Sequence, residues 1–274
     1  MRVAGKVFGW GATVDLHHDQ CTSGNCLFGQ DSTLQRLRLE ALRASVVREL
    51  KSRGVPGGNP KLQAYLGSPY PVLGLSTPNM REVMKTHRTI FKFLEVGQLN
   101  SLAGLLWKGP TFEEKSFAIS LLDGFARSLD DESWAVANRW IDESSGWALC
   151  DALGSGPISA MVYKEQGRFK EVLGWTHSEN LWRRRVAAYS LRKFVSAGEL
   201  EKPFILLNLL LYDKEFWVQR AVGTWLRECW KKDRDRTESF LLGHAHNLPR
   251  VVTTVATERA PTSFREELRR RRTV

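Results

Sequence analysis

The sequence predicts an all-α protein in which pairs of helices stack as repeats. Three observations support this fold class. Helix-start signals and apolar helical periods follow one another, with short breaks, from about residue 31 to residue 259. Strand-like alternation of apolar and polar residues is nearly absent. A motif that begins with an aromatic residue recurs every 35 residues, which is the signature of a repeat architecture.

The chain is predicted to have three parts. Residues 1–30 contain five glycines and no helical period, so an irregular or mobile leader is expected there. A first helix, capped by Asp31 or Ser32, is expected to run to about Gly54. The repeat domain is predicted to span 31–260, and residues 261–274, which include LRRRR, are predicted to form a basic C-terminal tail.

Two later helix starts carry capping residues. Thr77 is expected as an N-cap because Pro78 follows it, and proline is favoured at the first helical position. Thr111 and Glu114 have the spacing of a capping box, in which each side chain accepts a hydrogen bond from the other residue's backbone N–H. The sequence therefore predicts helices that begin near residues 78 and 112.

The strongest signal is the internal period. SENLWRRRVAAYSLR at 178–192 aligns with DKEFWVQRAVGTWLR at 213–227 at a shift of 35 residues. An aromatic residue then recurs one period apart at Phe112, Trp147, Trp182 and Trp217. Three positions later, three of the four repeats carry a cation: Lys115, Arg185 and Arg220. A period of this length with paired helices is typical of HEAT-like solenoids, in which neighbouring repeats must stack to bury their apolar faces.

A stack of this kind has a concave face lined by the same position of successive helices. The recurring cation lies almost one turn after the aromatic residue, on nearly the same face, so a concave basic face with a column of cations is expected. The alternative is that the aromatic residues form core contacts between repeats and the cations form caps or ion pairs between repeats.

One repeat breaks the cation pattern. It carries Cys150 at the cation position, followed at once by Asp151. Trp147 and Asp151 are four residues apart, so on a helix the indole and the carboxylate project side by side. A carboxylate can stabilise the oxocarbenium-like sugar that forms when a base–sugar bond breaks, and an indole face adds cation–π attraction. The alternative is a core tryptophan beside a solvated aspartate.

Composition restricts the partners. The net charge of +10 and the pI of about 9.6 favour a polyanionic partner, most commonly a phosphate backbone. The alternative is a solvated basic surface without a specific partner. No apolar run approaches the roughly 18 residues that span a bilayer, and no secretory signal is present. We therefore expect no membrane partner and a cytoplasmic, nucleoid-associated location.

The cysteine pattern argues against a disulfide framework and against a metal. None of the cysteines forms a CxxC pair, so reduced thiols are expected. A group of potential zinc ligands near the N-terminus matches no closed four-ligand spacing. That group consists of His17, His18, Asp19, Cys21 and Cys26. No metal and no cofactor are expected.

Taken together, these motifs resemble the AlkD-type DNA alkylation repair glycosylases, a bacterial family with HEAT-like repeats. The resemblance runs from about Ala64 to Pro261. It rests on AYLGSPYPVLGLSTP, SSGWALCD, HSENLWRRRVAA and DKEFWVQRAVGTWLRE, in this order. It implies hydrolysis of cationic N3- or N7-alkylpurines in double-stranded DNA by a monomer, without insertion of the lesion into a tight pocket.

The resemblance also implies roles for particular residues. It implies that Trp147 and Asp151 are catalytic, that Arg185 contacts a DNA phosphate and that Tyr65 contacts DNA. The DNA-binding surface is further predicted to include Trp182, Arg184, Arg220 and Trp225.

Two features depart from the family pattern. The family usually has tryptophan directly after the glycine of its A-x-G-W-x-L-R-E stretch, where this chain has Thr224 followed by Trp225. Either Trp225 supplies the aromatic wall after a small helix rotation, or the cleft is wider on that side. A wider cleft would suit a bulky adduct. The second departure is the first 30 residues, which match nothing in the family.

Three functions remain open at this stage. A glycosylase is favoured because Trp147 and Asp151 are both present. The alternative is a non-catalytic HEAT-repeat protein that binds branched or distorted DNA. A protein–protein scaffold is the third, and an acidic or apolar groove would favour it, because fold alone does not decide function.

Overall fold

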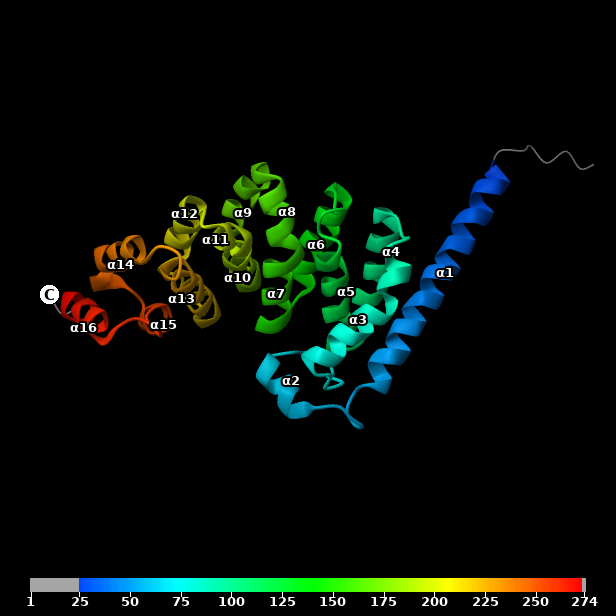
Figure 1. The fold of residues 1–274 in the computed structure, drawn as a ribbon, viewed down its shortest axis with the longest axis horizontal. Helices are drawn as coiled ribbons and strands as arrows, with labels where there is room; N and C mark the ends of the chain where they lie inside the picture. Colours follow the sequence, from blue (N-terminus) through cyan, green and yellow to red (C-terminus); the bar gives the residue numbers. More distant parts are fainter. Residues whose placement is uncertain (1–24, 273–274) are drawn as a thin grey trace, which may run out of the picture. The chain divides into compact units, whose positions relative to one another are not determined.

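A computed structural model describes residues 25–272, and this part of the chain is helical and contains no strand (Figure 1). By their internal contacts the residues divide into two units, 1–38 and 39–274. Helix α1 (Asn25–Ser52) extends from the first unit into the second. It begins earlier than residue 31, because once a helix is nucleated each further residue adds a backbone hydrogen bond, and no proline interrupts this stretch.

The second unit consists of helices joined by short connections. They are α2 (Pro60–Leu66), α3 (Thr77–Phe91), α4 (Val96–Trp107), α5 (Phe112–Gly124), α6 (Asp131–Glu143), α7 (Trp147–Leu153), α8 (Ser159–Lys164), α9 (Phe169–Trp175), α10 (Leu181–Tyr189), α11 (Arg192–Ala197), α12 (Glu201–Leu210), α13 (Phe216–Trp230), α14 (Arg234–Gly243), α15 (Arg250–Ala256) and α16 (Thr262–Arg272). A π-helical turn at Gly154–Ile158 and short 3₁₀ turns at Gln166–Arg168 and Ala245–Asn247 complete it.

The caps predicted at Thr77 and Thr111 agree with helix starts to within one residue, whereas the cap predicted at Asp31 or Ser32 is wrong, because both residues lie inside α1. Thr111 caps α5 and forms the predicted capping box with Glu114. At α3 the cap is Ser76, whose hydroxyl accepts a hydrogen bond from the backbone N–H of Asn79, and Thr77 is already helical. The start of α3 therefore lies one residue earlier than predicted.

The helices form the repeat stack that the period predicts. An inner row runs α3, α5, α7, α10, α13, α15, with each helix packed against the next. Outer helices cover this row, with α4 on α5 and α6, and with α12 and α14 on α13. Helices α5, α7, α10 and α13 begin within one residue of the four recurring aromatic positions. The helical-repeat fold is confirmed.

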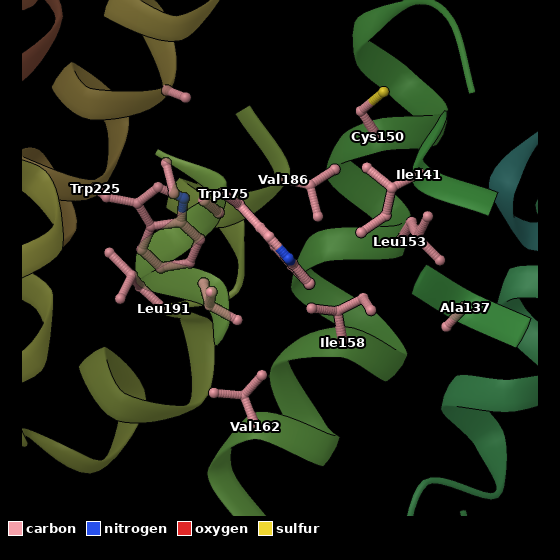
Figure 2. Close-up of a cluster of buried hydrophobic side chains, with 14 of the residues drawn as sticks. Ala137, Ile141, Cys150, Leu153, Ile158, Val162, Trp175, Val186, Leu191 and Trp225 are labelled. Atoms are coloured by element: carbon pink, nitrogen blue, oxygen red, sulfur yellow. The ribbon is translucent and has the colours of Figure 1, made fainter. Parts of the chain in front are cut away.

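The core runs between these layers. Figure 2 shows part of it, with Cys150 and Leu153 of α7 and Val186 of α10 in one apolar cluster. Cys150 is fully buried and occupies the repeat position that holds a cation elsewhere. In this repeat the position therefore faces the neighbouring repeat rather than solvent.

The column of cations expected on the concave face is wrong for two of its three members, because both are buried. Lys115 is buried, donates a hydrogen bond to the carbonyl of Trp107 and lies over the Tyr70 ring. Arg185 is also buried. Arg220 is exposed. Arg185 forms an ion pair with Asp151 of the preceding repeat, whereas the residue one period after Asp151 is Val186, which offers Arg220 no carboxylate.

The predicted basic tail contains the last helix of the stack. Helix α16 packs against α14, and its side chains Phe264 and Leu268 are buried. No helix within residues 25–272 is long and apolar enough to cross a bilayer.

Candidate active site

An open pocket of about 310 Å³ lies along the inner row. Helices α7, α10 and α13 contribute most of its walls, and α2 contributes one residue. The lining residues are Tyr65, Trp147, Asp151, Arg185, Tyr189, Trp217, Arg220 and Thr224. Trp147 and Asp151, which the sequence places together, do line one pocket.

Trp147 is held by the end of α2. Its indole Nε1–H donates a hydrogen bond of 2.8 Å to the backbone carbonyl of Tyr65. The Tyr65 ring stands edge-on to the indole, with 5.5 Å between ring centroids. The side chain of Tyr65 is 70% exposed, so it forms an outer rim of the pocket.

Two glycines allow α2 and α7 to meet. Gly67 ends α2 in the left-handed conformation, with φ of 61°. Gly146, which precedes α7, has φ of 88°, and a Cβ atom built on it would lie 2.1 Å from the carbonyl oxygen of Gly67. Because no side chain fits there, glycine at 146 is required for the contact that positions Tyr65 beside Trp147.

Asp151 lies one turn after Trp147 and is paired with Arg185. Its two oxygens accept hydrogen bonds from Nε and Nη2 of the guanidinium, at 2.7 and 2.8 Å. The side chain of Asp151 is 16% exposed and that of Arg185 is 4% exposed. Burial raises the pKa of the Asp151 carboxyl, and this effect outweighs the lowering by Arg185.

Every nitrogen of the Arg185 guanidinium donates at least one hydrogen bond. Besides the pair with Asp151, Nη1 donates to the backbone carbonyl of Trp217, and Nη2 lies 3.3 Å from the hydroxyl of Tyr189. The guanidinium also faces the rings of Tyr189 and Trp217, at 5.0 and 5.7 Å from their centroids. Arg185 therefore holds Asp151 in place, and does not have the exposed position expected of a phosphate contact. A buried charge needs a partner of this kind.

Tyr189 is a pocket residue that the sequence did not reveal. It lies one turn after Arg185, and burial raises the pKa of its hydroxyl. The hydroxyl forms a hydrogen bond with Thr224, and a hydrogen bond with Asp151 that lowers the pKa of that carboxyl. One period earlier lies Gly154, whose missing side chain leaves room for the Cβ of Tyr189.

Comparison with known proteins identifies the family of this chain. Residues 46–260 match the family model described as DNA alkylation repair enzyme. The chain belongs to the DNA alkylation repair enzyme family. No functionally curated protein matches it significantly.

Several solved structures share the fold. A predicted DNA alkylation repair enzyme from Enterococcus faecalis is 18% identical, with a TM-score of 0.67, over 77% of this chain and 98% of its own. AlkD2 from Streptococcus mutans is 19% identical, with a TM-score of 0.55, over 66% and 89%. The protein smu.31 from Streptococcus mutans UA159 is 18% identical, with a TM-score of 0.55, over 66% and 93%. At these identities the similarity establishes the fold.

The departure from the repair family's pattern at Thr224 has a structural counterpart. Thr224 lines the pocket, whereas Trp225 is 7% exposed, does not line it, and packs edge-on against Tyr189 behind the wall. Trp225 therefore does not supply the aromatic wall. Tyr189 lines the pocket from α10, and its position is one period before Thr224. That register relation is the sequence signal that would have identified it.

The other predicted DNA-contacting residues divide between the pocket and its surroundings. Arg220 lines the pocket, is exposed, and lies over the Phe216 ring at 5.7 Å. No ion pair within residues 25–272 involves it. Trp182 packs against Trp217 outside the pocket, with 6.4 Å between ring centroids. Arg184 forms an ion pair of 2.6 Å with the buried Asp213 and lies outside the pocket as well.

Metal ligands do not gather in the described part of the chain. No group of three or more His, Cys, Asp and Glu residues suited to a metal occurs in it. His17, His18, Asp19 and Cys21, and the side chain of Cys26, lie outside the described residues.

Proposed function

We propose that this chain is a DNA glycosylase that hydrolyses the N-glycosidic bond of cationic N3- or N7-alkylated purines in double-stranded DNA, bulky adducts included. The observation that carries this proposal is the pairing of an indole and a carboxylate, Trp147 and Asp151, on the wall of one open pocket. Membership of the DNA alkylation repair family supports it.

The chemistry needs few groups. A purine that is alkylated on N3 or N7 is cationic and leaves as a neutral base, so no general acid is required. The deoxyribose becomes cationic as the bond lengthens. Asp151 faces that charge as an anion, and the Trp147 indole adds cation–π attraction of about 0.5–2 kcal/mol. Water, oriented by the carboxylate, then forms a bond to the anomeric carbon of the sugar and releases one proton to the solvent.

The ion pair with Arg185 orients the carboxylate for this role. Each oxygen of Asp151 uses one lone pair toward the guanidinium, and a carboxylate oxygen has a second. Asp151 is more exposed than Arg185, so the pair presents its negative end to the pocket. Arg185 thus fixes the carboxylate without blocking it.

The rim of the pocket suits a DNA duplex. Arg220 is an exposed cation on the pocket wall, and Tyr65 is an exposed ring on the α2 side. Phosphate contacts of this kind position a protein on DNA without reading its sequence. We propose that a monomer acts without a cofactor, as the resemblance to the AlkD-type glycosylases implies.

The side chain at 224 supports the inclusion of bulky adducts. Threonine stands on the pocket wall where the family usually has tryptophan, and Trp225 is directed into the core. On the α13 side, a smaller side chain therefore projects into the pocket than in the family pattern, which leaves more room for the adduct. A comparison of base release from a methyl adduct and from a bulky N3-adenine adduct tests this point, and faster release of the methylated base would contradict it.

The central test compares two aspartates. Asp151→Asn should bind a duplex but lose most release of free base from randomly methylated DNA, because the amide carries no charge. Asp213→Asn is the matched control. Asp213 is also a buried partner of an arginine, but it lies outside the pocket. Equal base release by both variants would exclude Asp151 as the catalytic group.

A second function is favoured by one observation. Because Arg185 neutralises Asp151, the site also fits a non-catalytic protein that binds branched or distorted DNA. In that case the wild-type protein would release no base above the uncatalysed rate, and it would bind a branched duplex more tightly than a linear one. The same base-release assay therefore separates the two functions.

A further inference from the structure

A second pocket, of about 470 Å³, lies between α15 and α16 and is lined by arginines. Arg250 comes from α15, and Arg265, Arg269 and Arg272 come from α16. We call these four residues the arginine cluster. All four side chains are exposed. The hydroxyls of Thr253 and Thr254 and the side chains of Thr257, Glu258 and Leu268 complete the lining.

Helical geometry places the three arginines of α16 together. Positions 265, 269 and 272 are separated by four and three residues, so they share one face of the helix. Phe264 and Leu268 are buried and fix α16 on the stack. The cluster is therefore presented by a packed helix.

Within residues 25–272, no ion pair compensates the charge of the arginine cluster. Residues 250–272 contain seven arginines and three glutamates, which gives this short segment a charge of +4 out of the +10 of the whole chain. Glu258 is the one carboxylate among the lining residues that the structure describes, and it accepts a hydrogen bond from Arg227. Arg265 bonds only the hydroxyl of Thr262 among residues 25–272.

Arginines elsewhere in the stack behave differently. Arg183, Arg184 and Arg185 pair with Asp142, Asp213 and Asp151. On α16 itself, Arg271 bonds Glu267 and faces a different pocket. Several guanidinium groups around one hollow repel one another, and an anion with several charges relieves that repulsion. The arginine cluster thus has the chemistry of a phosphate-binding surface.

The position of the cluster along the stack suits the same duplex as the candidate active site. Helix α15 follows α13 in the inner row, so three inter-helix steps separate it from α7, which carries Asp151. At about 8–10 Å a step, this is roughly 24–30 Å along the row. A duplex rises about 3.4 Å per base pair, so the distance corresponds to roughly 7–9 base pairs. The family match ends at residue 260, before α16 begins.

We propose that the arginine cluster binds backbone phosphates of duplex DNA to one side of the active-site pocket. The proposal rests on the proposed function only in that the protein acts on duplex DNA. It requires no base release. The cluster adds affinity without sequence preference, because phosphates are the same at every step of the duplex.

The test measures binding of the full chain to an unmodified duplex of about 25 base pairs over a range of salt concentrations. The variant Arg250→Gln/Arg269→Gln removes two charges from the cluster. The control variant Arg234→Gln/Arg271→Gln removes two charges that lie outside it and form ion pairs with glutamates. Each phosphate contact contributes about 0.9 to the slope of log K against log salt.

For the cluster variant we expect the slope to fall by about two units relative to wild type. Between 50 and 200 mM salt, its affinity should then fall about tenfold less than that of the wild type. The control should keep the wild-type slope to within about half a unit. Equal slopes for the two double variants would overturn the proposal, because the effect would then come from net charge.

A second measurement identifies the anion. If the cluster variant loses binding to vesicles of anionic phospholipid but binds duplex DNA as the wild type does, the cluster serves a membrane surface and the proposal is wrong. Base release from methylated DNA is measured separately. A wild-type protein that binds DNA through the cluster but releases no base would contradict the glycosylase proposal and leave the cluster assignment supported.

Discussion

Both carboxylate oxygens of Asp151 accept hydrogen bonds from the guanidinium of Arg185, which lies 34 positions later and in the next inner helix. The two side chains form a bidentate ion pair, with two parallel hydrogen bonds, at the wall of the pocket. Removal of either partner leaves the other as a buried, uncompensated charge, which is far more costly than the pair itself.

Arg185→Gln should lower the free energy of unfolding by about 3–5 kcal/mol, because it leaves Asp151 buried without its cation. Replacement of both residues, as Asp151→Leu/Arg185→Met, should restore most of that loss, because no buried charge remains. Urea unfolding of the two variants measures both effects. If Arg185→Gln were as stable as wild type, the pair would have no structural role.

Acidic pH should reduce base release before it reduces folding. The proposed catalysis needs the ionised Asp151 carboxylate, and burial raises the pKa of this carboxyl above its ordinary value of 3.8. In a plot of base-release rate against pH, the fall on the acidic side (the acid limb) should therefore have its midpoint above 3.8. The pKa is higher in the folded than in the unfolded protein, so the folded state takes up this proton first as the pH falls. Protonation of Asp151 therefore does not itself unfold the chain. Circular dichroism at each pH separates lost activity from lost structure.

Tyr189→Phe should shift that acid limb to higher pH. The hydroxyl of Tyr189 lowers the pKa of Asp151 by hydrogen bonding, and phenylalanine removes this hydroxyl while it keeps the ring. We expect roughly tenfold slower base release, the effect of losing about 1.4 kcal/mol of stabilisation. Tyr163→Phe is the control, because that hydroxyl bonds Glu199 away from the pocket. A slower rate with an unmoved acid limb would mean that Tyr189 only fills space.

Gly146→Ala should destabilise the protein by more than about 2 kcal/mol. An alanine at this position would be strained by the positive φ. Its Cβ would also collide with the Gly67 carbonyl oxygen, 2.1 Å away. Gly174→Ala provides the comparison, because a Cβ there meets nothing within 4 Å and the residue lies in α9. That change should stabilise the chain by up to about 1 kcal/mol. Chemical denaturation measures both variants, and equal stabilities would show that α2 docks without the glycine contact.

The arginine cluster should affect binding more than turnover. In single-turnover base release, Arg250→Gln/Arg269→Gln should need more protein for half-maximal rate and reach the wild-type rate at saturation, because it touches no reacting group. A lower rate at saturating protein would mean that the cluster shapes the active-site pocket.

Much of the architecture follows from the sequence. The period of 35 residues correctly predicts where α5, α7, α10 and α13 begin, and the spacing of Trp147 and Asp151 correctly predicts that they share a wall. Local signals were sufficient because caps and helical periods act over a few residues.

What the sequence left unresolved depends on contacts between repeats. Arg185 and Arg220 hold the same repeat position, yet one is buried against Asp151 and the other is exposed. The difference lies in the preceding repeat, which offers Asp151 to the first and Val186 to the second. Tyr189 was missed for a similar reason, because only the packing of α10 between α7 and α13 brings it to the pocket.

The guanidinium of Arg185 bonds Asp151 of α7 and the backbone of Trp217 in α13, and its own helix lies between them. One side chain thus fastens three successive inner helices at the wall of the pocket. A helical-repeat protein adjusts to its ligand by small changes of spacing along its length, and such a change here would have to break one of these bonds. The stack is therefore stiff at α7, α10 and α13. Any bending that follows the contour of DNA must take place in the repeats on either side of these three helices.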